Sequence, residues 1–85
     1  MSNDEVRRLL GRLRSELEHT ELDAETRAAL AQLDTDIHGV LGADEHEGYD
    51  VVEQARRLES TFAAEHPTAN RVLREIIDTL GKLGI

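Results

Sequence analysis

The chain has no cysteine, no tryptophan and one proline among its 85 residues, and Tyr49 and Phe62 are its only aromatic residues. The lack of cysteine excludes disulfides, thiolate metal sites and cysteine nucleophiles, and it favours the cytoplasm over an oxidising compartment. With two aromatic side chains the chain cannot assemble a platform that stacks bases, sugars or flat cofactors. These absences narrow the function to one that aliphatic and charged side chains can perform.

Long apolar runs are missing as well. No stretch approaches the roughly 20 apolar residues that a membrane-spanning helix needs. The first five residues are polar and acidic, whereas a secretory signal begins with a basic segment followed by an apolar one. We therefore expect a cytoplasmic protein that has no membrane partner.

Positive charge is scarce and unevenly placed. The chain has 10 lysine and arginine residues against 18 aspartate and glutamate residues, which gives a net charge of −8. Residues 1–15 contain four arginines, whereas residues 16–50 carry eleven acids against Arg27 alone. Because such an acidic segment repels phosphates and anionic lipid surfaces, we expect no nucleic-acid partner.

The apolar residues that are present are almost all aliphatic. A chain of 85 residues supports one domain at most, and it buries roughly 60 to 65% of its unfolded surface on folding. Apart from Met1 and Tyr49 there are 22 large apolar residues, and all but Phe62 are valine, leucine or isoleucine. Such residues suit helix-on-helix packing, so we predict a single all-α domain over residues 1–85.

In four segments the apolar residues recur every three or four positions, which places them on one side of an α-helix. We predict helices at residues 3–19, 24–41, 50–64 and 67–81. Because the fourth apolar stripe is the widest, the fourth helix should be the most buried. The stripes are Val6, Leu9, Leu10, Leu13 and Leu17; Leu30, Leu33, Ile37, Val40 and Leu41; Val51, Ala55, Leu58 and Phe62; and Ala69, Val72, Leu73, Ile76, Ile77 and Leu80.

Local signals predict where these helices begin. Ser2 and Glu5 have the spacing of a capping box, in which each residue bonds to the backbone amide of the other. Asp23 is placed to accept hydrogen bonds from the free amides of the second helix. Asp50 or Tyr49 should do the same for the third helix.

Other signals predict where the helices end. Gly42 and the polar residues 43–48 should end the second helix and form a mobile loop. His66 and Pro67 should interrupt the third helix, with Pro67 as the first residue of the fourth. Leu83 and Ile85 lie beyond the fourth helix and are expected to fold back over the core.

Two architectures remain open at this point. Short connections favour antiparallel neighbours, so an antiparallel four-helix bundle is the simplest arrangement. The alternative is a set of helical hairpins whose core is completed by dimerisation. This alternative follows from the narrow stripes of the first three helices, which resemble coiled-coil seams more than the faces of a globular protein.

Two segments of the chain carry a family resemblance. The C-terminal third contains Phe62-x-x-x-His66-Pro67, the apolar pairs within residues 72–80, and a closing Leu83-Gly84-Ile85. The N-terminal segment contains a Glu-Val-Arg-Arg-Leu-Leu run at residues 5–10 and a Leu-x-x-Glu-Leu pattern at residues 13–17. Together these features resemble DUF4404, a family of short bacterial proteins of unknown function. The resemblance implies a small bacterial helical protein and no particular activity, cofactor or site residue.

Histidines at positions 19, 38, 46 and 66 raise a metal hypothesis, because imidazole and carboxylate groups bind zinc and nickel. Asp34 and His38 are four residues apart and can share one helix face, whereas Asp36 points away from them. A second group, Asp44-Glu45-His46-Glu47, lies in the predicted loop. A solvated acidic surface explains both groups more simply, so we assign no metal site.

Two further residues have a structural and a functional interpretation. His66 is expected to cap a helix or fill a tight turn rather than to respond to pH. Tyr49 is expected to pack over the end of the bundle rather than to anchor a partner.

The arginines at positions 7, 8, 12 and 14 can be solvated flank residues. They can also pair with an acidic partner, including the acidic second helix of the same chain or of another copy. Exposed ion pairs of this kind contribute only about 0 to 1 kcal/mol each.

No combination of residues indicates catalysis. The serines at positions 2, 15 and 60 lack the context of a nucleophile elbow, and no glycine-rich phosphate loop is present. We therefore predict no enzyme, no catalytic residue and no cofactor. The expected function is a protein–protein interaction or self-associating module whose partner is another protein or a second copy. The alternative is a metal- or small-ligand-binding regulatory protein that uses the His/Asp/Glu-rich loop around His46.

Overall fold

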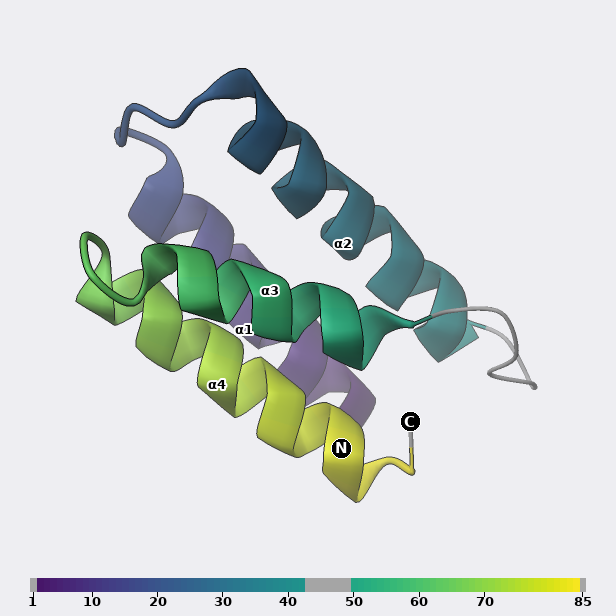
Figure 1. Cartoon of the computed structure of the whole chain (residues 1–85). Coiled ribbons are helices and arrows are strands. Elements are labelled where there is room, and N and C mark those ends of the chain that lie inside the picture. The colour runs from purple at the N-terminus through teal and green to yellow at the C-terminus, as the bar shows by residue number, and fades with distance from the viewer. Residues whose placement is uncertain (1, 43–49, 85) are drawn as a thin grey trace.

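The structure is a computed structural model that describes residues 2–42 and 50–84, and these ranges form four α-helices without a strand. Successive helices run antiparallel, as Figure 1 shows. The prediction of an all-α bundle is confirmed. The helices are α1 (Ser2–Leu17), α2 (Ala24–Gly42), α3 (Val51–Phe62) and α4 (Pro67–Lys82).

The four helices do not pack equally. α4 packs extensively on both α1 and α3, whereas α2 packs mainly on α3 and touches α1 only marginally. The order around the bundle is therefore α1, α4, α3 and α2. In Figure 1 α2 lies at the outer edge of this arrangement. The seam between α1 and α2 is the least tightly closed of the four.

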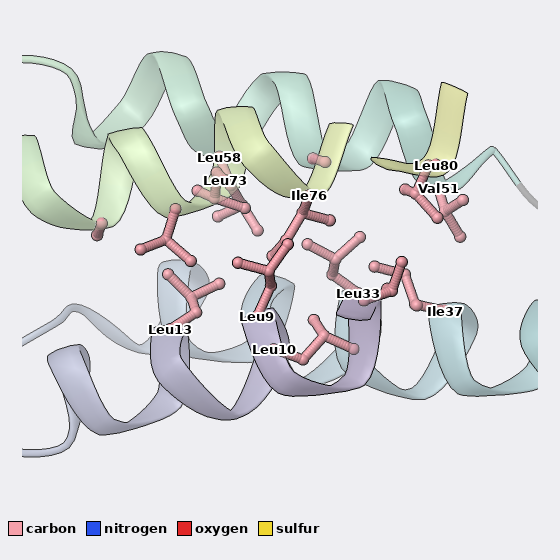
Figure 2. Close-up of a cluster of buried hydrophobic side chains, with 14 of the residues drawn as sticks. Leu9, Leu10, Leu13, Leu33, Ile37, Val51, Leu58, Leu73, Ile76 and Leu80 are labelled. Atoms are coloured by element: carbon pink, nitrogen blue, oxygen red, sulfur yellow. The ribbon is translucent and has the colours of Figure 1, made fainter. Parts of the chain in front are cut away.

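The predicted apolar stripes form one core between the helices. Figure 2 shows leucines of α1 pointing toward Leu73 and Ile76 of α4, with Leu33 and Ile37 of α2 beside them. Every predicted stripe residue is buried except Leu30 and Ile77, which are half-buried against the same cluster. Full burial of one such side chain stabilises the fold by about 1.5–3 kcal/mol. The periodicity therefore identified the core correctly.

α4 contributes most to this core. Six of its residues are buried, against five on α1 and four on each of α2 and α3. The one buried polar residue of the described chain, Thr79, donates its hydroxyl to the Glu75 carbonyl oxygen at 2.9 Å, so its burial leaves no unmatched group. Leu83 folds back against the core as expected, and Ile85 lies outside the described residues.

α1 ends at Leu17, two residues before its predicted end. The Thr20 amide donates to the Leu17 carbonyl oxygen at 3.2 Å, and the Thr20 hydroxyl donates to the Glu16 carbonyl oxygen at 3.3 Å. These bonds satisfy two of the carbonyl groups that any helix leaves free at its C-terminus. The chain can therefore turn toward α2 earlier than the apolar pattern indicated.

α3 begins after Asp50, which is one of the two residues, Asp50 and Tyr49, that were expected to cap this helix. The Asp50 carboxylate accepts a hydrogen bond from the Glu53 amide at 3.4 Å. Tyr49 and the predicted mobile loop at residues 43–48 lie outside the described residues, as does the Ser2 side chain of the expected capping box.

The turn between α3 and α4 depends on packing more than on capping. Pro67 is the first residue of α4, as predicted, and His66 precedes it without forming a side-chain cap bond. The His66 ring instead packs edge-on against Phe62, with 5.4 Å between the ring centroids. Asn70 then donates to the Glu59 carbonyl oxygen at 2.6 Å and ties α4 to the last turn of α3. His66 was expected either to cap a helix or to fill a tight turn, and it fills the turn.

The two glycines near the end of α4, Gly81 and Gly84, differ in backbone conformation. Gly84 has a φ of +81°, a conformation that costs other residues about 1 kcal/mol, whereas Gly81 is helical. A methyl group at either position meets no atom within 4 Å beyond the adjacent residues and, at Gly81, the backbone of its own helix. Gly84→Ala should therefore lower the free energy of unfolding by about 1 kcal/mol, while Gly81→Ala should raise it by up to about 1 kcal/mol. Urea denaturation measures both, and a change of the same sign in the two variants would contradict this account.

Candidate functional site

A groove lies along the loosely closed seam between α1 and α2. Its volume is about 410 Å³, which falls in the range of roughly 300–1,000 Å³ that is typical of ligand-binding clefts. Its floor is formed by buried leucines of both helices, and the half-buried Leu22 and Leu30 form part of its walls. The floor residues are Leu10, Leu13, Leu17 and Leu33.

The groove exists because the first half of α2 does not reach the core. Residues 24–32 include no buried residue, and the buried part of the helix begins at Leu33. Four of these nine residues are alanines, all exposed, and Leu30 is the one large apolar side chain among them. With so little apolar volume to bury, this half of α2 packs loosely beside the buried leucines of α1 that line the groove.

The charges on the groove rim balance one another. Arg14 and Glu18 come from α1 and the residue after its end, and Arg27 and Asp34 come from α2. Arg14 Nη2 lies 3.1 Å from Asp34 Oδ2 and bridges the two helices. Because the Arg14 side chain is 72% exposed, this ion pair contributes at most about 1 kcal/mol. The groove therefore presents an apolar floor within a nearly neutral rim.

Asp23 fixes the position where α2 begins, next to the groove. Its Oδ1 accepts a hydrogen bond from the Thr26 amide at 2.8 Å, and its carbonyl oxygen accepts from the Arg27 amide at 3.0 Å. The Thr26 side chain, and then the Thr26 amide, hydrogen-bond to the carboxylate and lower the pKa of Asp23. Asp23 is therefore the helix cap that the sequence predicted.

The predicted metal-ligating residues do not gather into a site within residues 2–42 and 50–84, where no group of three candidate ligands is found. His38 Nε2 lies 3.5 Å from Asp34 Oδ1, so these two residues share a face as expected. Asp36 points elsewhere and accepts hydrogen bonds from Gln32 and Gln54. The group at positions 44–47 lies outside the described residues.

The structure separates the arginines that the sequence grouped together. Arg14 pairs with Asp34 of the second helix, which is one of the two roles that the sequence left open for these arginines. Arg7 instead lies 3.8 Å from Asp4 on its own helix. Among the described residues, the Arg14–Asp34 pair is the one ion pair that joins α1 to α2.

A second, smaller hollow of about 210 Å³ lies at one end of the bundle, where the end of α1 meets the start of α4. Glu16, Glu65 and His66 contribute to its lining. The packing of His66 on Phe62 accounts for the position of this histidine without a ligand. The apolar residues Leu17, Pro67 and Ala69 give the hollow only a small apolar surface.

Sequence reasoning missed the groove because it considered only a core closed within the chain or a core completed by dimerisation. The signal that indicates it is the shortage of large apolar residues in the first half of the second helix. At the positions where a core-facing side chain is due, this segment offers Thr26 and then Leu30. The narrow stripe of the second helix, which also fits a seam with a second chain, borders a groove within one chain.

Comparison with known proteins supports the resemblance seen in the sequence. The family model described as Domain of unknown function (DUF4404) matches residues 6–85, which is nearly the whole chain. No curated protein and no solved structure matches the chain significantly. In the described parts of the chain, none of the helices has both the length and the apolar composition of a membrane span.

The lowered pKa of Asp23 predicts how the start of α2 responds to acid. Because the folded pKa lies below the unfolded one, the cap stabilises the helix fully above the unfolded pKa, and this contribution is lost as pH falls through the folded pKa. An NMR titration of the Thr26 amide should follow the Asp23 carboxylate, and Asp23→Ala should abolish that transition. Glu21→Ala is the control, since it removes a neighbouring carboxylate outside the cap. An unchanged Thr26 titration in Asp23→Ala would show that the cap does not form.

Proposed function

The chain belongs to the DUF4404 family, whose description assigns no activity, and we propose from its geometry that it is a protein-interaction module whose α1–α2 groove binds an amphipathic helix. The observation that carries this proposal is the groove itself, with four buried leucines on its floor. An amphipathic helix that lays its apolar side in such a groove gains free energy by removing from water its own apolar residues and the half-buried Leu22 and Leu30 of the groove walls.

The shape and polarity of the groove support a helix over a polar ligand. The rim carries two arginines and two acids, and its floor presents no polar side chain that could orient a small polar molecule. The two walls are themselves helices, so a third helix between them restores the packing that α2 leaves incomplete. We propose accordingly a binding role without catalysis, in the cytoplasm of a bacterium.

The alternative of a metal- or small-ligand-binding regulatory protein depends on the loop around His46. That loop lies outside the described residues, and Asp34 and His38 supply two ligands where a stable zinc site needs three or four. This alternative therefore stays a prediction from the sequence.

A model peptide tests the proposal. A peptide of about four helical turns, with leucine and alanine on one side and glutamine and lysine on the other, should shift the NMR signals of Leu13, Leu17 and Leu30. Leu30→Glu should weaken its binding at least about tenfold, because a carboxylate then lies on the apolar path of the peptide.

Leu83→Glu is the matched control for this substitution. Leu83 is also half-buried against the core, but it lies past the end of α4 and outside the groove. Circular dichroism should show that both variants remain helical. Equal loss of peptide binding in the two variants, or peptide-induced shifts located away from the groove, would contradict the proposed function.

A further inference from the structure

The Asp34 carboxylate on the groove rim is shared by two basic side chains from different helices. Its Oδ2 lies 3.1 Å from Arg14 Nη2 of α1, and its Oδ1 lies 3.5 Å from His38 Nε2, which is four residues further along α2. Asp34 is the least exposed of the three, with 28% of its side chain accessible against 45% for His38 and 72% for Arg14. Among the described residues, no other carboxylate has both an arginine and a histidine as ion-pair partners.

The Arg14–Asp34 pair lies on the solvent side of the groove floor. Leu10 and Leu17 are four residues before and three residues after Arg14, so they share its side of α1, and both are buried whereas Arg14 is exposed. The pair therefore joins the two walls of the groove outside these leucines. A helix that enters the groove has to separate the two side chains, because its apolar side needs the space between the walls.

His38 changes how strongly Asp34 holds Arg14 across the groove. When His38 is neutral, the carboxylate acts on Arg14 alone. A protonated His38 places a second positive charge beside the same carboxylate, which offsets the charge of Asp34 and repels Arg14. Histidine is the residue that gains its proton between about pH 8 and pH 5, where ordinary carboxylates keep their charge.

The surroundings of His38 leave this effect to Asp34 and Arg14. Asp34 is the one carboxylate of the described residues that pairs with His38. Of the two helices that contact α2, α1 supplies Arg14, and α3 supplies Gln54, which donates to Asp36 at 3.0 Å. Asp36 lies two residues before His38 and thus points to a different side of the helix. His38 is also outside the groove lining, so a change at this position removes no surface that a bound helix would contact.

We propose that the Arg14–Asp34 pair closes the groove against its partner helix and that protonation of His38 weakens this closure, so that the groove binds a helix more tightly in mild acid. The inference rests on the proposed function, because it describes the regulation of the same groove. Arg14 covers the groove, Asp34 holds Arg14 in place, and His38 makes this hold dependent on pH.

Substitutions at the pair test the closure at about pH 8, where histidine is neutral. The probe is the model peptide with its lysines replaced by glutamine, so that its side chains carry no charge. Arg14→Gln and Asp34→Asn should each raise its affinity about two- to fivefold, the factor that corresponds to an exposed ion pair. Exchanging the two charges, by Arg14→Asp together with Asp34→Arg, should restore the affinity of the natural chain.

Arg7→Gln is the control for these variants. Arg7 pairs with Asp4 on its own helix and lies outside the groove lining, so its substitution should leave the affinity unchanged. Circular dichroism should show that every variant keeps its helices.

A pH series tests the role of His38. The affinity of the natural chain for the uncharged peptide should rise about two- to threefold between about pH 8 and pH 5.5. His38→Gln should remove this rise because glutamine stays neutral, whereas His19→Gln, which changes an exposed histidine outside the groove lining, should keep it. Without peptide, the NMR signal of the Arg14 Nε–H group should follow the titration of His38, which tests the pair independently of binding.

The results separate failure of this inference from failure of the proposed function. Equal affinity of the natural chain, Arg14→Gln and Asp34→Asn for the peptide would overturn the closure and leave the groove as a helix-binding site. A pH response that persists in His38→Gln, or an Arg14 signal that does not follow His38, would overturn the role of the histidine. Absence of peptide binding in the natural chain and in every variant would overturn the proposed function, and the regulation with it.

Discussion

Burial of aliphatic side chains against α4 is the interaction on which the rest of the structure depends. α4 is the helix that packs extensively on two neighbours, and Leu73 and Ile76 at its centre are fully buried. α1 and α3 are held by this contact, whereas α2 is held mainly through α3. The helices α1, α3 and α4 therefore pack closely on one another, whereas α2 is anchored in the core along only its second half. The candidate groove forms where the first half of α2 is not anchored.

The sequence was sufficient to predict much of this fold, because aliphatic periodicity reports the direction of burial. Every stripe residue except Leu30 and Ile77 is fully buried, and the helix starts at Pro67 and after Asp23 and Asp50 follow from capping chemistry. The helix ends were harder to predict. Thr20 closes α1 through hydrogen bonds to backbone carbonyl groups, and no apolar pattern records such bonds.

The groove could not be predicted from periodicity, since a leucine on the inner side of a helix looks the same whether its neighbour approaches or not. Leu13 and Leu17 fit a closed core and an open groove equally well in the sequence. The decisive fact is that α1 and α2 touch only marginally, because the alanines of residues 24–32 bring little volume to the seam.

Amide hydrogen exchange of the natural chain tests the central claim most directly. Exchange reports local opening, and the account predicts the slowest exchange at the centre of α4, around Leu73 and Ile76. The amides of Ala28 and Ala29 in the first half of α2 should exchange far faster, although they too lie inside a helix. Equal protection of these two segments would contradict the account, because it would mean that α2 is secured along its whole length and that the seam with α1 is closed.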